Sequence, residues 1–404
     1  MNKRILILVV TIFLLIGTSP AYADVTLSIN GKSYFPLTPA YLENGVTMIG
    51  LDNVSRVMGG TVLIDGDLYV LSKNDIKLEL MVGQTTAKLN GRTYNLAAAP
   101  KMVDEEVMVP LRSVMEALGA EVEWQPQTRT VAVTYLETRK GMTPKEVMLK
   151  SNQVLTEHNT YKIRAELLEK ADTGIPDQSL KNFRVLDLAV QRNPVLAHAK
   201  TSVRVEDPSP HLETSSSELI IDERVITYEG EFYTVPNFER WVKDISGKDN
   251  QNLLEAFLQF YEPMKNIKRL CDAGAIISFA DDCIIDEQEC WTVRVVREHR
   301  REQFYDKQQA ASEYVRCTAE VYDIFINQSS FELLSIKSEL TSLSHWQDTG
   351  IQTKTETTGY YYIYDLDQPV TVPDVSDYIT KDDYRQIILA PGVPDDIKEM
   401  LLTD

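Results

Sequence analysis

Asn30-Gly31-Lys32-Ser33-Tyr34 returns sixty residues later as Asn90-Gly91-Arg92-Thr93-Tyr94, and this repeat decides how the first part of the chain folds. The same offset relates further positions: Leu51, Val54, Gly59 and Val62 return as Leu111, Val114, Gly119 and Val122. A single offset shared by so many positions indicates that one small supersecondary unit was duplicated. The repeat predicts a domain of two similar halves over residues 24–136.

Each half has the same expected order of elements. A short strand leads into the Asn-Gly turn, which is the strongest short hairpin signal. A buried segment then enters a short helix, whose apolar stripe in the second half has i, i+3, i+4, i+7 spacing: Leu111, Val114, Met115 and Leu118. A second hairpin follows and carries Trp124, which aligns with Ile64 in the repeat. We interpret Trp124 as part of the domain core rather than as a platform for a sugar.

The second half carries Asn90-Gly91-Arg92, Val109-Pro110-Leu111-Arg112 and Glu116-Ala117-Leu118-Gly119-Ala120, followed by Val122-Glu123-Trp124 and Thr130-Val131. In these residues the duplicated region resembles the copper amine oxidase N-terminal-like domain of exported bacterial proteins. The first half departs from the motif, because Gly50 and Asp52 stand where it has proline and arginine. The resemblance implies a stalk, since copper and the quinone cofactor belong to a separate catalytic domain in that family.

Amine oxidase chemistry is not expected here. The catalytic domain needs clustered histidines and a tyrosine in a Thr-x-x-Asn-Tyr context, whereas this chain has five isolated histidines and no such context. No H-E-x-x-H, G-x-S-x-G or P-loop motif occurs either. The close acidic pairs Asp281-Asp282 and Asp286-Glu287 are interpreted as solvated turns. We therefore predict no catalytic residues, no cofactor, no metal site and no enzymatic activity.

The first 23 residues are expected to be a cleaved signal peptide. Lys3 and Arg4 precede the apolar run 5–16, and Ala21-Tyr22-Ala23 forms a small-x-small cleavage site. An uncleaved anchor helix is the alternative, but the run is shorter than the roughly 20 residues that a membrane span needs. No cysteine lies near the cleavage site, so a lipoprotein is not expected. The sequence predicts a secreted or cell-wall-associated protein with no transmembrane segment after cleavage.

The net charge of the chain argues against nucleic acid as a partner. The chain has a formal net charge of −19, which becomes about −21 without the leader, and such a chain repels nucleic acid.

All four cysteines lie in the second half: Cys271, Cys283, Cys290 and Cys317. In an exported protein an even count indicates disulfides, with three possible connectivities. A Cys283–Cys290 bridge across a hairpin is one of them, and Cys271–Cys317 would follow.

Residues 143–375 are expected to form a second, β-rich domain after a linker at residues 137–142. Thr143-Pro144-Lys145-Glu146 is a capping box that opens a helix. Eight runs rich in valine, isoleucine, threonine and tyrosine then read as strands, and Asn252–Tyr261 interrupts them as a helix. The fold class is α+β, with a large curved antiparallel sheet in the form of a half-barrel and few covering helices. Residues 376–404 read as an acidic tail.

In this order of elements, and in the closing Tyr364…Pro369-Val370-Thr371-Val372-Pro373 strand, the second domain resembles the LolA/LppX-type lipoprotein carriers. That resemblance implies a hydrophobic cavity inside the half-barrel. The tyrosines of the last long strand, Tyr360, Tyr362 and Tyr364, are candidates for lining it. Packing of these side chains against a covering helix is the alternative.

Three functions remain open at this point. The first is an exported, non-enzymatic binding protein in which a stalk-like module precedes a domain that binds a lipid or another amphipathic small molecule. The second is an adhesion protein that binds wall polymer or a protein partner in the cell envelope. The third is a hydrolase that the motifs do not reveal.

Overall fold

The computed structural model describes residues 25–103, 105–172, 179–206, 219–234, 240–246, 250–305, 312–346 and 352–388. The expected leader peptide and most of the expected tail lie outside these residues. The chain divides into two compact units, one built mainly from residues up to Tyr135 and the other mainly from Leu136 onward. We refer to them as the duplicated unit and the sheet unit. The fold class is confirmed as α+β.

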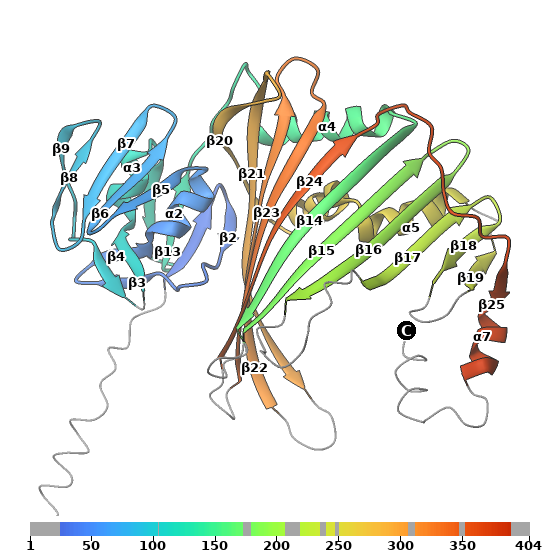
Figure 1. Ribbon diagram of the computed structural model, residues 1–404. Coiled ribbons are helices and arrows are strands. Elements are labelled where there is room, and N and C mark those ends of the chain that lie inside the picture. Colours follow the sequence, from blue (N-terminus) through green and yellow to red (C-terminus); the bar gives the residue numbers. More distant parts are fainter. Residues whose placement is uncertain are drawn as a thin grey trace, which may run out of the picture. The chain divides into compact units, whose positions relative to one another are not determined.

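The duplicated unit repeats one series of elements (Figure 1). The first copy contains β1 (Thr26–Ile29), β2 (Lys32–Tyr34), β3 (Tyr41–Glu43), β4 (Val46–Gly50), α2 (Leu51–Met58), β5 (Thr61–Asp65) and β6 (Leu68–Lys73). After β7 (Ile76–Met81), the second contains β8 (Thr86–Leu89), β9 (Arg92–Asn95), β10 (Lys101–Val103), β11 (Glu106–Pro110), α3 (Leu111–Ala117), β12 (Glu121–Gln125) and β13 (Thr130–Thr134). The first six elements of each copy begin sixty residues apart, as the repeat predicts.

The two copies meet around a local two-fold axis. In the antiparallel pair of β4 with β11, Ile49 lies opposite Val109, which is its own counterpart in the repeat. The first hairpin of each copy is exchanged, because β1–β2 join the sheet of β12–β13 whereas β8–β9 join the sheet of β5–β7. Each copy therefore completes the other, and neither half can bury its apolar face alone.

The core of this unit consists of matched pairs from the two copies. Ile49 and Val109, Leu51 and Leu111, and Val54 and Val114 are all at most 2% exposed. The prediction that Trp124 belongs to this core is wrong, because Trp124 is 39% exposed and its counterpart Ile64 is 66% exposed. Both residues lie on edge strands, β12 and β5, whose side chains are mostly exposed.

The sheet unit is one 12-stranded sheet with helices. Its elements are α4 (Pro144–Glu157), β14 (Thr160–Asp172), β15 (Ser179–Gln191), β16 (Leu196–Glu206), β17 (Leu219–Thr227), β18 (Gly230–Tyr233), β19 (Trp241–Ser246), α5 (Asn250–Tyr261), α6 (Pro263–Asp272), β20 (Ile276–Ile285), β21 (Gln288–Tyr305), β22 (Ser312–Asn327), β23 (Leu333–Trp346), β24 (Gln352–Tyr364), β25 (Tyr378–Thr380) and α7 (Lys381–Ile388). The strand order is β20-β21-β22-β23-β24-β14-β15-β16-β17-β18-β19-β25.

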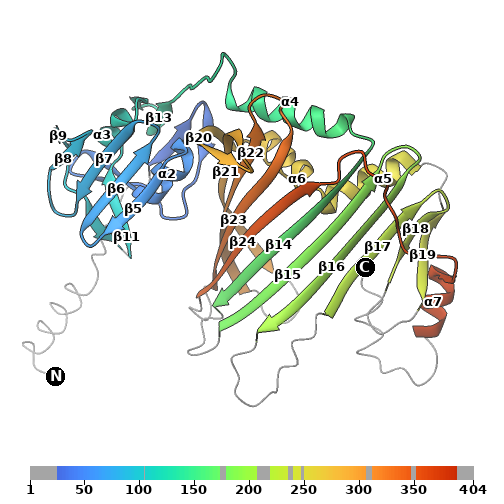
Figure 2. The same ribbon diagram turned by 45° about the horizontal axis from the view of Figure 1, so that its top comes forward.

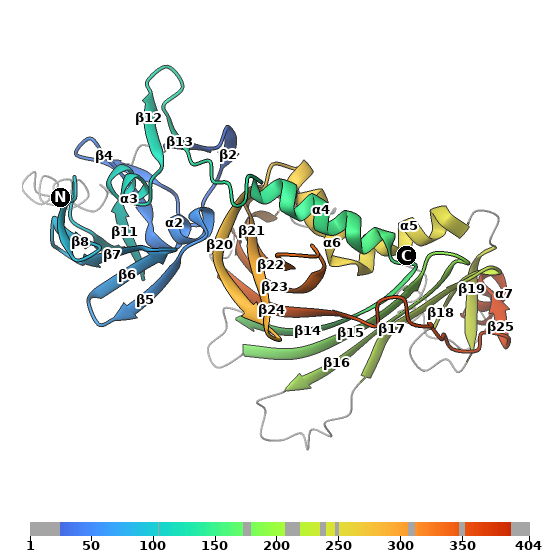
Figure 3. The ribbon, with the colours of Figure 1, turned by 90° about the horizontal axis from the view of Figure 1, so that it is seen from above.

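All neighbouring strands are antiparallel except β19 and β25. β25 pairs in parallel with β19, so residues 378–380 form the edge of the sheet and do not belong to a tail. The sheet curves around α4, α5 and α6, which lie on its concave side (Figures 2 and 3). The sequence reading missed α6, although Met264, Ile267 and Leu270 recur at the i, i+3 spacing of a buried helix face.

One hydrophobic core fills the space between the three helices and the concave face. It joins Val147 and Leu155 of α4, Leu258 of α5 and Ile267 of α6 to inward side chains of the strands. The predicted capping box opens α4: the Glu146 amide donates to the Thr143 hydroxyl at 3.3 Å, and the Thr143 amide donates to Glu146 Oε2 at 2.8 Å. A cap of this kind contributes about 1 kcal/mol to helix stability.

Candidate functional site

A cavity of about 590 Å³ opens on the concave face where α5 ends and α6 begins. We call it the sheet cavity. Its volume lies in the range of about 300–1,000 Å³ that is typical of ligand sites. The strands contribute Leu167, Arg184, Leu186, Thr201, Tyr322 and Tyr361, and the helical corner contributes residues 259–263 with Asn266 and Arg269.

The lining is amphipathic. Leu167, Leu186 and Tyr361 come from the adjacent strands β14, β15 and β24, so they form a continuous apolar floor. Arg184 and Arg269 are exposed and place two positive charges at the same opening. Phe260 is 84% exposed, which leaves a large aromatic side chain in solvent beside the cavity. Such an arrangement can hold an apolar body and an anionic group together.

Hydrogen bonds fix the corner of α5 and α6 over the sheet. The Tyr261 hydroxyl donates to Asp222 of β17, and Asn266 Nδ2 donates to the Tyr322 hydroxyl at 2.9 Å. Arg269 donates to Asn266 Oδ1 at 2.6 Å, which orients the guanidinium at the opening. Burial raises the pKa of Tyr322 and of Tyr261, so both hydroxyls stay protonated and able to donate. The cavity wall is therefore fixed at both helices.

Glu262 joins the two helices and is the most unusual group in the cavity. Its side chain lines the cavity, yet the residue is only 2% exposed, and neither carboxylate oxygen has a hydrogen bond of normal geometry. Burial raises its pKa and outweighs the opposing effects of Arg192, Lys265 and the nearby Tyr161 hydroxyl. A protonated Glu262 could donate a hydrogen bond to a ligand at the back of the cavity.

Replacing Glu262 with glutamine is expected to stabilise the fold at pH 7. A raised pKa means that the folded chain binds this proton more tightly than the unfolded chain, so ionisation costs stability as the pH rises above the ordinary value of 4.5. Glu262→Gln removes that cost, with an expected gain on the order of 1 kcal/mol. The gain should disappear below about pH 4.5, where glutamate is protonated in both states.

Urea denaturation from pH 4 to pH 8 measures this difference. The control is Asp272→Asn, because Asp272 is an exposed carboxylate on α6 and forms an ion pair with Lys268 at 2.8 Å. The control should not gain stability with rising pH. A Glu262→Gln effect that is the same at every pH would show that ionisation of Glu262 does not oppose folding.

The tyrosines predicted to line a cavity lie on the other face of β24. Tyr360, Tyr362 and Tyr364 are 40–47% exposed and alternate with Tyr361 and Ile363, which pack against the core. The prediction for these three residues is therefore wrong, and Tyr361 lines the cavity instead. From sequence alone, either set of alternating side chains in this aromatic run could face the core. The pairing of Tyr361 with Ala165 and Ile336 places Tyr361 on the inner face.

No disulfide joins any of the four cysteines, all of which lie among the described residues, so neither predicted bridge is formed in this structure. Cys283 and Cys290 are direct partners across the hairpin of β20 and β21. Cys271 lies on α6, on the concave side. Cys317 is five residues from the inward-facing Tyr322 on an unshifted stretch of β22, so it points to the other face. The sheet separates Cys271 from Cys317, which rules out that pairing in this fold.

The acidic residues have structural partners. Asp282 forms an ion pair with Arg139, and Asp367 accepts hydrogen bonds from His158 and from the Asn159 amide. Asp286 and Glu287 have positive φ angles in the turn of the hairpin. Within the described part of the chain, no group of three His, Cys, Asp or Glu side chains could hold a metal ion. No helix in that part is long and apolar enough to cross a membrane.

Residues 28–133 match the family described as copper amine oxidase N-terminal domain, which confirms the resemblance drawn from the repeat. No curated protein matches the chain. Among solved structures, a DUF1329 family protein from Desulfovibrio piger ATCC 29098 is 9% identical, with 57% of this chain and 94% of that chain covered and a TM-score of 0.21. A structure titled for lipid–protein interactions in lipovitellin is 11% identical, with 53% of this chain covered and a TM-score of 0.23. This chain spans about a quarter of the lipovitellin chain, 26% of its length.

Proposed function

We propose that this protein is an exported, non-enzymatic binding protein whose sheet unit holds an amphipathic, anionic small molecule of the fatty-acid type. The observation that supports this function is the lining of the sheet cavity, which combines an apolar floor with two exposed arginines. The duplicated unit acts as a stalk that connects the binding unit to the envelope. This role rests on the match of residues 28–133 to a domain that is non-catalytic in its family.

The physical basis is burial of apolar ligand surface. Each square ångström of apolar surface removed from water contributes about 25 cal/mol, and Leu167, Leu186 and Tyr361 offer such a contact. Arg184 forms no ion pair among the described residues, so its guanidinium can bind a carboxylate. Charge-assisted hydrogen bonds of this kind are about twice as strong as neutral ones. The ligand carboxylate would therefore lie at the opening and its chain along the sheet.

Titration of residues 24–404 with a dansyl-labelled fatty acid tests the proposal. Thr201 lines the cavity, so Thr201→Trp should fill it and weaken binding by at least about tenfold, or 1.4 kcal/mol. Lys200→Trp is the matched control on the same strand. Lys200 pairs with Asp187 and Glu223 and faces away from the cavity, so this variant should bind as the parent does.

A methyl ester of the same probe tests the arginines, because it lacks the charge and should bind more weakly. Solvent extraction of the protein purified from its host should release a bound amphipathic acid. If the parent neither yields a lipid nor takes up the probe, the proposed function is wrong. Equal binding by Thr201→Trp and Lys200→Trp would place the ligand outside the sheet cavity.

The exposed tyrosines favour a second candidate, adhesion to wall polymer. Tyr360, Tyr362 and Tyr364 form a row on the outer face of β24, about 7 Å apart by the rise of a strand. Exposed aromatic rings can stack on sugar rings. Pulldown on purified cell wall separates the two functions, because loss of retention on replacing all three tyrosines with serine would favour adhesion. If the triple-serine variant is retained as the parent is, the three tyrosines do not bind wall polymer.

A further inference from the structure

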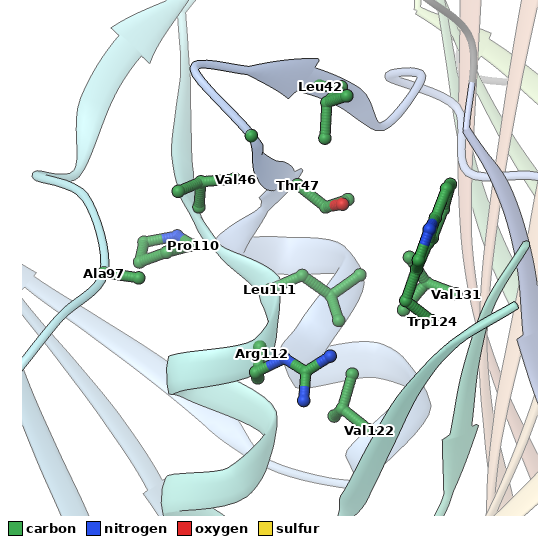
Figure 4. Close-up of a pocket in the computed structure, with 11 residues that line it drawn as sticks. Leu42, Val46, Thr47, Ala97, Pro110, Leu111, Arg112, Val122, Trp124 and Val131 are labelled. Atoms are coloured by element: carbon green, nitrogen blue, oxygen red, sulfur yellow. The ribbon is translucent and has the colours of Figure 1, made fainter. Parts of the chain in front are cut away.

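The duplicated unit contains a cavity of its own, with a volume of about 440 Å³ (Figure 4). We call it the repeat pocket. It is formed by both copies, because the hairpin of β3 and β4 supplies Leu42, Gly45, Val46 and Thr47, and the second copy supplies Ala97, Pro110, Leu111, Arg112, Val122, Trp124 and Val131. The buried side chains of Pro110, Leu111 and Val131 form its floor.

The rim of the repeat pocket is apolar but exposed. Trp124 and Leu42 lie on neighbouring sides of the pocket and are 39% and 37% exposed, so large apolar surfaces remain in contact with water. Arg112 is the single charged residue among those that line the pocket. In Figure 4 its guanidinium lies between Leu111 and Val122. An apolar slot with one cation has the chemistry to receive an apolar group that carries one negative charge.

The first copy shows that the fold does not require an arginine and a tryptophan at the positions of Arg112 and Trp124. It builds the same helix and hairpin with Asp52 in place of Arg112 and Ile64 in place of Trp124. Above Gly50, the counterpart of Pro110, the space is taken by the carboxylate of Glu106: a Cβ placed on Gly50 would lie 1.7 Å from Glu106 Oε1. The residue that corresponds to Glu106 beside the repeat pocket is Val46, which has no charge. The repeat pocket thus has the positive charge and the aromatic ring, with Val46 where the equivalent site around Gly50 has the carboxylate of Glu106.

We propose that the repeat pocket binds a small carboxylate with an apolar, preferably aromatic, body. The body stacks on Trp124 above Leu111 and Val131, and the carboxylate accepts hydrogen bonds from Arg112. Arg112 also lies 3.6 Å from Glu116, one turn further along α3. Exposed pairs of this type contribute little, and a guanidinium has five donors, so Glu116 leaves donors for the ligand. This site is separate from the sheet cavity and does not depend on the function proposed for it.

Calorimetric titration of residues 24–404 with 3-phenylpropionate and with 3-phenylpropionamide tests the assignment. The two compounds have the same body and differ only in the end group, an anionic carboxylate or a neutral amide, so the acid should bind at least about tenfold more tightly than the amide, the effect of one charge-assisted hydrogen bond. Arg112→Gln should reduce the acid to the affinity of the amide and leave the amide unchanged. Trp124→Ala should weaken both compounds.

The first copy supplies matched controls. Asp52→Asn and Ile64→Ala change the counterparts of Arg112 and Trp124, and both variants should bind the acid as the parent does. All four positions are exposed, and a thermal melt verifies that each variant is folded. Equal affinity for acid and amide, no binding of either at millimolar concentration, or full binding by both Arg112→Gln and Trp124→Ala would overturn the proposal. None of these outcomes bears on fatty-acid binding by the sheet cavity.

Discussion

Replacing Trp291 with alanine is expected to lower the free energy of unfolding of the sheet unit by about 3–5 kcal/mol, the usual cost of removing a buried aromatic side chain. Trp291 is 2% exposed and belongs to the core between the helices and the concave face. Its ring centroid lies 5.1 Å from that of Phe331, and Lys140 Nζ lies 5.3 Å from the ring. Truncation removes both contacts and leaves a cavity that the surrounding strands cannot close.

Urea denaturation followed by far-ultraviolet circular dichroism measures this loss without relying on tryptophan fluorescence. Tyr362→Ala is the matched control, because it truncates an aromatic residue that is 47% exposed on the outer face of the same sheet. Its effect should stay within about 1 kcal/mol. If the two variants lost similar stability, the concave face would not be the side that holds the core.

The second large effect is expected at the centre of the repeat. Ile49→Asp should destabilise the duplicated unit by at least about 3–5 kcal/mol, because it buries a charge without a partner. Ile49 and the opposing Val109 are both completely buried, and they are direct partners in the antiparallel pair of β4 and β11. Since each copy completes the sheet of the other, a defect at this pair affects both halves.

Limited proteolysis shows this effect as the loss of a resistant fragment that covers the duplicated unit. Ile64→Asp makes the same change in the same copy at a position that is 66% exposed, and it should leave the fragment intact. Resistance of the Ile49→Asp variant would mean that the two copies fold independently. That result would contradict the exchange of hairpins between their sheets.

Much of the architecture was readable from local sequence. The offset of sixty residues placed the elements of the duplicated unit, and both Asn-Gly turns have the two positive φ angles that such hairpins require, at Asn30 and Gly31 and at Asn90 and Gly91. The capping box at Thr143 and Glu146 opens α4 as predicted. These signals succeed because turns and caps depend on the few residues that form them.

Site residues were much less predictable. Tyr361, Arg184 and Arg269 meet in one cavity although they are far apart in the chain, and no motif connects them. One feature of the sequence pointed to Glu262: it is a carboxylate directly before the proline that opens α6. Its burial could not be inferred, because α6 itself was missed. Trp124 was placed in the core because its repeat partner is apolar, yet both side chains lie on exposed edge strands.

Local sequence signals were sufficient to predict the duplication, the β-rich second unit, and the caps and turns that bound their elements. Which face of each strand is inside depends on packing between distant segments. A strand alternates its side chains with a period of two, so Tyr360, Tyr362 and Tyr364 on one side and Tyr361 and Ile363 on the other fit a buried face equally well. Pairing with distant strands determines which of the two faces is buried. The same long-range packing forms the sheet cavity at the corner of α5 and α6, and the repeat pocket beside Arg112 and Trp124.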